Sequence, residues 1–334
     1  MGAIIVQTDR LVCREFETAD VEPLYAIVRD PMHMRFTFTT ESRVECAAWL
    51  QRHASARAVH GFAPWTAVQR SRGEVVGWGG PNVDPDVPGW GPEVTYFIHP
   101  SYAGRGFATE LVRASLEVAF GHLGLPRMRA FTRPANVASA RVLTKCGFAR
   151  VRYEPALERD RYEVRRQDWG GTLGDGATIV RDAGLDEIED VRRLFREYQA
   201  EIGVDLCFQD FADELATLPG RYAAPGGRLS IAITGPATSG CGAMRALGSG
   251  ACEIKRLYVR RPFRGRGLGR LLAGALIRSA RDTGYERMFL DTLASMHEAR
   301  ALYRSLGFAD VAAYYDNPHP GAMYLALELR PSAE

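Results

Sequence analysis

The sequence predicts an α/β protein built from two tandem copies of one fold, each with a mixed central β-sheet flanked by helices. Length is the first observation, because 334 residues exceed the roughly 100–200 of a typical single domain. A glycine-rich segment at 104–108 recurs at 265–269, an offset of 161 residues (104 to 265). A Gly-Phe pair at 147–148 recurs at 307–308, an offset of 160 residues (147 to 307). Two landmarks that shift together indicate a duplication.

The boundary between the copies is predicted at residues 167–177. This segment, QDWGGTLGDGA, is rich in glycine and lacks hydrophobic periodicity, as a linker does. We therefore expect an N-terminal domain at 3–168 and a C-terminal domain at 177–332. Each domain opens with a β-rich stretch, at 11–14 in the first and at 178–181 in the second.

Each copy then runs through the same series of elements. Two helices are followed by three short β-rich runs, a glycine-rich loop, a helix, a further strand and a helix that ends at Gly147 or Gly307. Glycine is common just after a helix, where the backbone turns left-handed. The elements are predicted at 19–29, 43–57, 65–69, 74–80, 93–99, 108–123 and 128–132 in the first copy, and at 185–200, 208–217, 229–234, 241–247, 252–259, 269–283 and 288–292 in the second, with a last strand at 322–329.

Composition narrows the functional classes. Apolar residues make up 46% of the chain, enough for a core in each copy, and the net charge is only +2. That charge gives no bulk attraction to nucleic acid or to an acidic membrane surface. The six cysteines form no CxxC pair or metal-site pattern, and no run approaches the roughly 18 apolar residues of a membrane span. Because the apolar run at the N-terminus is too short for a signal peptide, we expect a cytoplasmic protein without metal, nucleic acid or membrane partners.

The glycine-rich loop of the second copy has the features of a pyrophosphate cradle. It opens into an amphipathic helix, whose first turn presents unpaired N–H groups, and its glycines let the backbone approach a diphosphate. A P-loop is excluded because no Gly-Lys-Ser/Thr follows, and a dinucleotide fold because the glycine spacing differs and the loop follows a late strand. Coenzyme A remains, with a plain tight turn as the alternative. The cradle comprises Arg264, Gly265, Arg266, Gly267, Leu268 and Gly269.

These residues resemble the GCN5-related N-acetyltransferase superfamily, whose signature is Arg/Gln-x-x-Gly-x-Gly/Ala at the start of a helix. The second copy matches it fully, while the first copy has Ala103 in place of the basic or amide residue. The first copy resembles the branch that acetylates ribosomal-protein N-termini and related amines, through the stretches 93–100, 104–110, 136–139 and 145–148.

The resemblance implies acetyl-CoA as co-substrate and a primary amine as acceptor. In the family the pantetheine arm lies along the strand before the loop, which corresponds to Leu257 and Val259 in the second copy and to Tyr96 and Ile98 in the first. The corresponding cradle of the first copy comprises Gly104, Arg105, Gly106, Phe107 and Ala108, and Asn136 is a further candidate for a cofactor contact.

Acetyl transfer to an amine also needs a proton acceptor for the amine and a proton donor for the leaving thiolate. The family often places a tyrosine at the position of Tyr303, so this residue is the expected acid; an ordinary half-buried helix tyrosine is the alternative. The first copy has leucine there, which leaves Ser139 as its donor.

Glu253 and Glu93 open the key strands and are the candidate bases, although a solvated carboxylate is an equal alternative. Glu253 lies six residues before Val259 but Glu93 lies five before Ile98. Strand alternation therefore points them to opposite faces unless a bulge intervenes.

We expect at least one active domain, with the chemistry in the C-terminal copy. In the alternative, the first copy binds acetyl-CoA, or serves as a scaffold, without turnover. A small-molecule amine and a protein or peptide N-terminus both remain open as acceptors, and so do a monomer and a homodimer. The aromatic, turn-rich segment at 314–320 either rims an acceptor pocket or is a packed loop.

Overall fold

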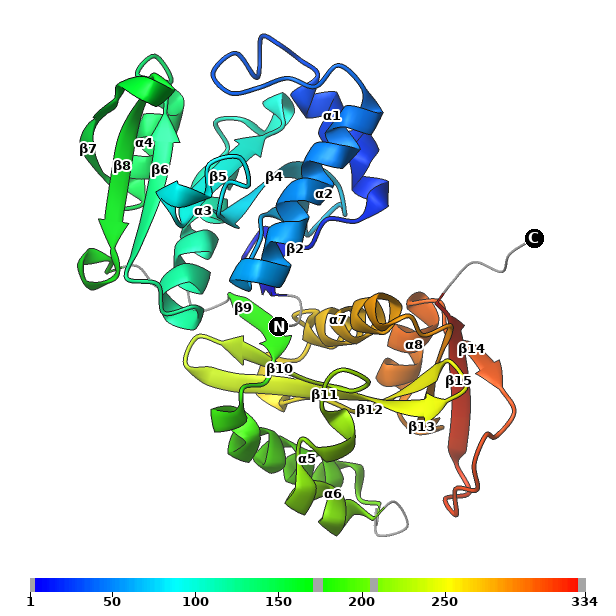
Figure 1. Ribbon diagram of the computed structural model, residues 1–334. Coiled ribbons are helices and arrows are strands. Elements are labelled where there is room, and N and C mark those ends of the chain that lie inside the picture. Colours follow the sequence, from blue (N-terminus) through cyan, green and yellow to red (C-terminus); the bar gives the residue numbers. More distant parts are fainter. Residues whose placement is uncertain (1–3, 171–176, 205–209, 330–334) are drawn as a thin grey trace. The chain divides into compact units, whose positions relative to one another are not determined.

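The computed structural model describes residues 4–170, 177–204 and 210–329. The chain forms two compact units that divide between Ala177 and Thr178 (Figure 1). Most of the predicted linker, residues 171–176, and the beginning of the helix predicted at 208–217 lie outside the described residues.

The first unit carries an eight-stranded sheet in the order β1-β2-β3-β4-β5-β6-β8-β7. Its helices α1 and α2 pack on one face of the sheet, and α3 and α4 on the other. The elements are β1 (Ile5–Gln7), β2 (Leu11–Arg14), α1 (Val21–Val28), α2 (Arg43–His60), β3 (Trp65–Gln69), β4 (Val75–Asn82), β5 (Glu93–Ile98), α3 (Phe107–Glu117), β6 (Arg127–Thr132), α4 (Val137–Lys145), β7 (Ala149–Glu154) and β8 (Arg159–Arg165).

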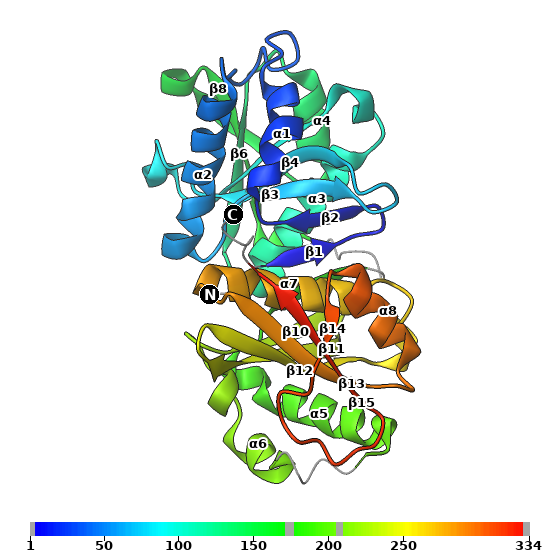
Figure 2. The same cartoon turned by 90° about the vertical axis from the view of Figure 1, so that its right-hand side faces the viewer.

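The second unit repeats this plan, with the strand order β9-β10-β11-β12-β13-β15-β14. Helices α7 and α8 cover one face and α5 and α6 the other, as the turned view shows (Figure 2). The elements are β9 (Thr178–Asp182), α5 (Ile188–Ile202), α6 (Phe211–Thr217), β10 (Arg228–Thr234), β11 (Ala237–Gly248), β12 (Ala251–Val259), α7 (Leu268–Thr283), β13 (Arg287–Leu293), α8 (His297–Ser305), β14 (Ala309–Val311) and β15 (Ala322–Glu328).

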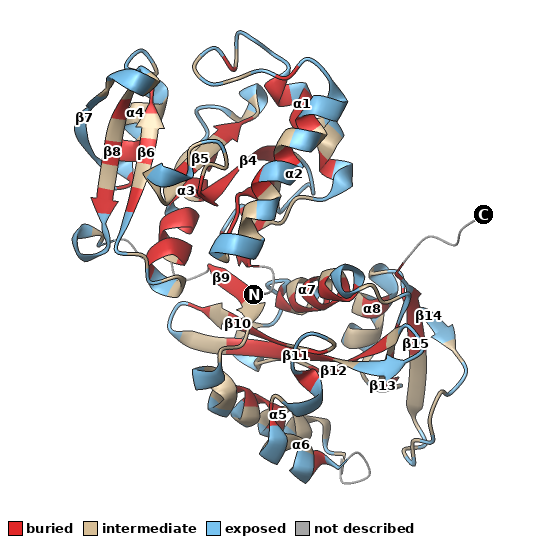
Figure 3. Ribbon diagram, in the orientation of Figure 1, coloured by how far each residue is buried: buried red, intermediate tan, exposed pale blue. Residues whose placement is uncertain are grey.

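Local sequence explains where the helices begin and end. Ser42 starts α2 by accepting a hydrogen bond from the backbone N–H of Glu45, the usual role of serine at that position. Gly147 and Gly307 follow α4 and α8 with φ values of 88° and 94°, which confirms the predicted glycine terminators. The buried residues lie where the helices meet the sheets (Figure 3), so each unit has its own core.

Strand β12 contains a one-residue bulge. Cys241 of β11 pairs with Tyr258 and Ala243 pairs with Lys255, so three steps along β12 oppose two along β11. Arg256, at the bulge, adopts a left-handed φ of 55°, as residues in bulges of this kind often must.

The bulge resolves the mismatch between the two glutamates. Strand β5 pairs with β4 without a register shift and places Glu93 opposite Asn82. On the N-terminal side of its bulge, β12 places Glu253 opposite Arg245. The two glutamates therefore occupy equivalent positions, because the bulge that was named as the exception to strand alternation is present in β12.

Candidate active site

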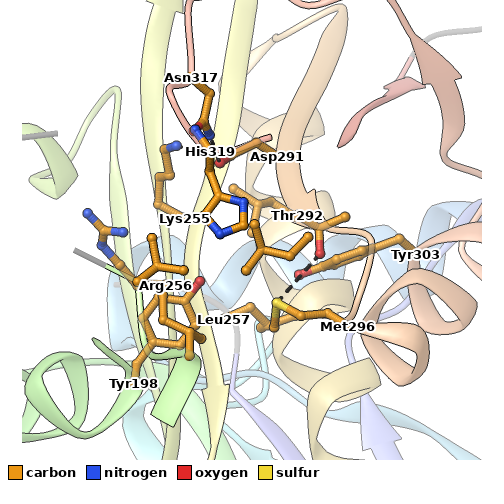
Figure 4. A pocket seen from close by; sticks show the side chains of 14 residues that line it. Tyr198, Lys255, Arg256, Leu257, Asp291, Thr292, Met296, Tyr303, Asn317 and His319 are labelled. Carbon is orange, nitrogen blue, oxygen red and sulfur yellow. Dashed lines mark hydrogen bonds and ion pairs between the residues drawn. The ribbon is translucent and has the colours of Figure 1, made fainter. Parts of the chain in front are cut away.

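A pocket in the second unit lies where strands β12 and β13 diverge (Figure 4). Within the described residues, their parallel pairing stops at Glu253 and Phe289. Beyond that point backbone groups of both strands lack partners in a shared ladder, as a ligand that pairs along a strand requires. The pocket is lined by Tyr198, Ile202, Val204, Ile254, Lys255, Arg256, Leu257, Asp291, Thr292, Leu293, Met296, Tyr303, Asn317 and His319.

Tyr303 brings a phenol into this pocket from helix α8 (Figure 4). Its ring packs edge-on against Phe308, with the ring centroids 5.8 Å apart, and only 6% of the residue is exposed. Burial raises the pKa of Tyr303 above its usual value, so the hydroxyl keeps its proton. Among the described residues this hydroxyl has no hydrogen-bond partner, which leaves it available to a ligand.

Glu253 does not line the pocket, because its buried carboxylate is occupied by three donors. The Nη2 atom of Arg245 lies 2.7 Å from Oε2, and the Nζ atom of Lys255 lies 3.1 Å from Oε1. The Tyr314 hydroxyl donates to Oε1 at 2.5 Å. The carboxylate is thus engaged within the fold and lies outside the pocket lining, so Glu253 is not placed where it could take a proton directly from an amine in the pocket.

The aromatic segment before β15 contributes to the pocket. The Tyr315 hydroxyl donates to Oδ2 of Asp291 at 2.8 Å, while Lys255 donates to Oδ1 at 2.6 Å. His319 also lines the pocket, and its Nδ1 accepts the backbone N–H of Gly321 at 3.2 Å. Of the two readings of this segment, the structure supports the one that places it at the rim of a pocket.

The glycine-rich loops of the two units have the same backbone conformation. Gly265 and Gly267 have φ values of 73° and 86°, and Gly104 and Gly106 have 72° and 84°. These left-handed conformations favour glycine. A Cβ atom added at Gly104 or Gly265 would meet no atom within 4 Å, so both loops border open space. The loop backbone and the helix N-terminus behind it suit a diphosphate.

The side chain of Arg264 is engaged inside the fold rather than directed at a ligand. Its Nε donates to the carbonyl of Val259 at 2.8 Å, and its Nη2 pairs with Glu201 of α5 at 2.6 Å. Arg264 therefore fixes the end of β12 ahead of the loop. The cofactor contact of Arg264 stays a prediction, and Val259 lies at the strand end outside the pocket lining.

Arg10 takes a comparable place in the first unit, where the signature arginine is missing. Its Nη1 donates to the carbonyl of Arg105 at 2.8 Å, and its Nη2 pairs with Glu110 at 2.6 Å. Its guanidinium also lies 4.5 Å from the ring centroid of Phe107. Sequence reasoning missed this residue, because it lies far from the loop along the chain.

Glu93 differs sharply from its counterpart in the second unit. The amide Nδ2 of Asn82 donates to its Oε1 at 3.1 Å, and this is the one hydrogen bond to the carboxylate among the described residues. Burial raises the pKa of Glu93 to about 7, partly offset by that hydrogen bond. A carboxyl group that titrates near neutral pH is suited to proton transfer.

The other candidates of the first unit lie together at the start of helix α4. The Asn136 side chain accepts the backbone N–H of Ser139 at 3.1 Å and caps the helix. The Oγ atom of Ser139 lies 2.9 Å from the Tyr96 hydroxyl. Leu143, at the position equivalent to Tyr303, is buried in the core. In the first unit, the hydroxyls of Tyr96 and Ser139 therefore lie close to the position that corresponds to Tyr303 in the second unit.

Neither a membrane-spanning helix nor a metal-binding cluster is found among the described residues. No described helix has the length and apolar character to cross a bilayer. Within the same ranges, no group of three or more histidine, cysteine, aspartate or glutamate side chains has the arrangement to hold a metal ion.

Comparisons with known proteins point to one family for both units. A model described as "Acetyltransferase (GNAT) domain" matches residues 10–149, and one described as "Acetyltransferase (GNAT) family" matches 188–308. An uncharacterized N-acetyltransferase of Schizosaccharomyces pombe is 41% identical over 145 residues, which cover 43% of this chain and 89% of that protein. An uncharacterized N-acetyltransferase of Escherichia coli is 30% identical over 138 residues, covering 40% and 83%. The crystal structure of a GNAT acetyltransferase from Bacillus anthracis matches with a TM-score of 0.42 and 21% identity, over 49% of this chain and 99% of that one.

Proposed function

Because the chain belongs to the GNAT acetyltransferase family and carries two of its domains in tandem, we propose that this N-acetyltransferase acylates a primary amine in the pocket of its C-terminal domain, with Tyr303 as general acid. The acceptor is a small-molecule amine or a protein N-terminus. We propose domain limits of 3–168 and 177–332. The observation that carries the assignment is the buried, protonated Tyr303 hydroxyl, which faces the pocket and has no partner among the described residues.

The residues present fit acetyl-CoA, which would supply a thioester-bound acetyl group and leave as a thiol. The glycine-rich loop of residues 265–269, which borders open space at Gly265, would hold the diphosphate through backbone N–H groups. The unpaired edge of β12 near Leu257 would hold the pantetheine arm. Tyr303 would donate its proton to the sulfur, where negative charge develops.

Glu253 is not available to take the proton of the acceptor ammonium, because its carboxylate oxygens already interact with the donor groups of three side chains. We propose that the second domain binds its acceptor as the neutral amine. Its rate should therefore rise with pH up to the pKa of the acceptor itself.

A second site is favoured by one specific observation. Glu93 has a single neutral hydrogen-bond partner and a pKa of about 7. We propose that the first domain also transfers acetyl groups, with Glu93 as base and Ser139 as donor. The alternative, in which the first domain binds acetyl-CoA without turnover, is the other outcome of the same test.

The test uses the full chain with acetyl-CoA and a panel of small primary amines and of peptides with free N-termini. Thiol release and the mass of the acetylated amine are measured for the wild type, Tyr303→Phe, Glu93→Gln and the double variant. We expect an acetylated product that each single variant reduces and the double variant abolishes. If no amine on the panel is acetylated, or if thiol is released without acetylated product, the proposed function is wrong.

A further inference from the structure

The equivalent glutamates of the two domains face different partners across the neighbouring strand. Asn82 stands opposite Glu93, and Arg245 stands opposite Glu253. Lys255 adds a second cation to Glu253. One carboxylate is thus held by a neutral amide and the other by two positive charges, although the backbone positions correspond.

The Asn82 amide is fixed in orientation by a histidine of helix α2. The Nδ1 atom of His53 lies 3.2 Å from Oδ1 of Asn82, while Nδ2 of Asn82 lies 3.1 Å from Oε1 of Glu93. With the opposite orientation, the amide oxygen would face the carboxylate oxygens, which in the ionised form can only accept hydrogen bonds. In this orientation Oδ1 accepts a hydrogen bond from the tautomer of His53 that carries its proton on Nδ1, and the NH₂ group is directed at Glu93.

The His53 ring is itself held in place. It is 4% exposed and packs against Trp49 and Trp78, with centroid distances of 4.5 Å and 5.3 Å. Burial lowers the pKa of His53, so the ring is neutral near neutral pH and keeps the single Nδ1 proton that this chain of hydrogen bonds requires.

The side chain that faces the carboxyl group affects which of its protonation states is favoured. Burial favours the neutral carboxylic acid, and one amide donor offsets only part of that cost, whereas adjacent cations favour the ionised form strongly. With a neutral donor, both protonation states lie close in free energy. Glu253, in contrast, has an arginine and a lysine as its neighbours.

We propose that Asn82, oriented by His53, is a positioning residue that keeps Glu93 able to take up and release a proton. The first domain therefore has a titrating carboxyl group at this position. The inference rests on the proposed function for the role of Glu93 in turnover, but its titration can be measured independently.

Other charged groups surround Glu93 and remain unchanged in the test. Those that face it or its two partners are Arg52, Asp84, Asp86 and Arg159, and Arg129, the residue paired with Glu93 on β6, is engaged near Glu163. Each variant therefore changes one group against a constant background.

The experiment follows the Glu93 carboxyl resonance by carbon-13 NMR from pH 4 to 10 in the full chain. The signal is identified by its loss in Glu93→Gln. We expect a midpoint near 7 in the wild type. Asn82→Asp, which keeps the shape but replaces the donor with a second acid, should raise the midpoint by roughly 1–3 pH units. Asn82→Arg, which copies Arg245, should lower it by a similar amount.

The control is Gln69→Glu, which adds a carboxylate at the far end of strand β3 and should leave the midpoint unchanged. His53→Phe should move the midpoint upward by less than Asn82→Asp does, because the amide loses its anchor but remains present. If Asn82→Arg does not fold, the isosteric Asn82→Asp and His53→Phe still decide the matter.

The acid limb of kcat/KM, measured in a Tyr303→Phe background with the amine found by the panel, should move with the NMR midpoint. A midpoint that is the same in the wild type and in every folded Asn82 and His53 variant would overturn the inference. If the midpoints shift as expected but Glu93→Gln keeps full activity, Asn82 is still a positioning residue for Glu93, but Glu93 is not the base of the first domain.

Discussion

Replacing Tyr303 by phenylalanine should remove most activity of the second domain while leaving its fold intact. The ring packs against Phe308 in the core, and phenylalanine preserves that contact. The hydroxyl has no partner among the described residues, so its loss leaves no unsatisfied donor or acceptor there, and the free energy of unfolding should change by less than about 1 kcal/mol.

The expected catalytic effect is much larger. Proton donation to a leaving group typically contributes roughly 10²–10⁴-fold in rate, which corresponds to about 3–5 kcal/mol of transition-state stabilisation. The loss should appear in kcat, with the affinity for acetyl-CoA little changed, because the hydroxyl acts on charge that develops only in the transition state.

The assay is steady-state kinetics on the full chain carrying Glu93→Gln, so that the second domain is observed alone. Tyr198→Phe is the matched control, since it removes a hydroxyl from another tyrosine of the same pocket. A Tyr303→Phe enzyme within twofold of its parent would refute the acid assignment. Equal losses in the two variants would show that the pocket needs both hydroxyls and that Tyr303 has no special role.

Three further substitutions and one pair of fragments test the cofactor site, the stability of each domain and the domain limits. Gly267→Val should abolish acetyl-CoA binding by the second domain in calorimetry, because a β-branched residue disfavours a φ of 86° and fills the cradle; unchanged binding would remove the cradle assignment. For Glu93, the carboxyl group has its usual pKa of 4.5 in the unfolded chain and a pKa of about 7 in the folded one, so its cost to folding is absent below pH 4.5 and complete above 7. Glu93→Gln should therefore raise the free energy of unfolding by about 3 kcal/mol at pH 8 and leave it unchanged at pH 4, as measured by urea denaturation. Glu214→Ala should lower stability by roughly 3–5 kcal/mol, because it leaves a buried guanidinium without its paired carboxylate; a thermal melt unchanged from wild type would contradict this. Fragments 1–170 and 175–334 should each unfold cooperatively, and failure of both would disprove the proposed domain limits.

Much of the fold was readable from the sequence because its signals are local. The recurrence of two glycine landmarks at nearly the same offset revealed the duplication. Strand β3 was predicted with its observed bounds, and the glycines after α4 and α8 adopt the expected left-handed conformation. The cradle glycines were recognisable as well, since their spacing and the helix behind them belong to one short stretch of chain.

The chemistry of the two glutamates was decided only by tertiary structure. Their positions looked inequivalent in the sequence, because a bulge adds one residue to β12 and no local pattern marks it. The partners of the two carboxyl groups come from other strands and helices: Asn82 and His53 for Glu93, and Arg245 and Tyr314 for Glu253. The sequence alone therefore determined the family, the duplication and the position of the two glycine-rich loops. Whether a carboxyl group can exchange a proton depends on its burial and on the charges within a few ångströms, and folding assembles that environment from distant parts of the chain.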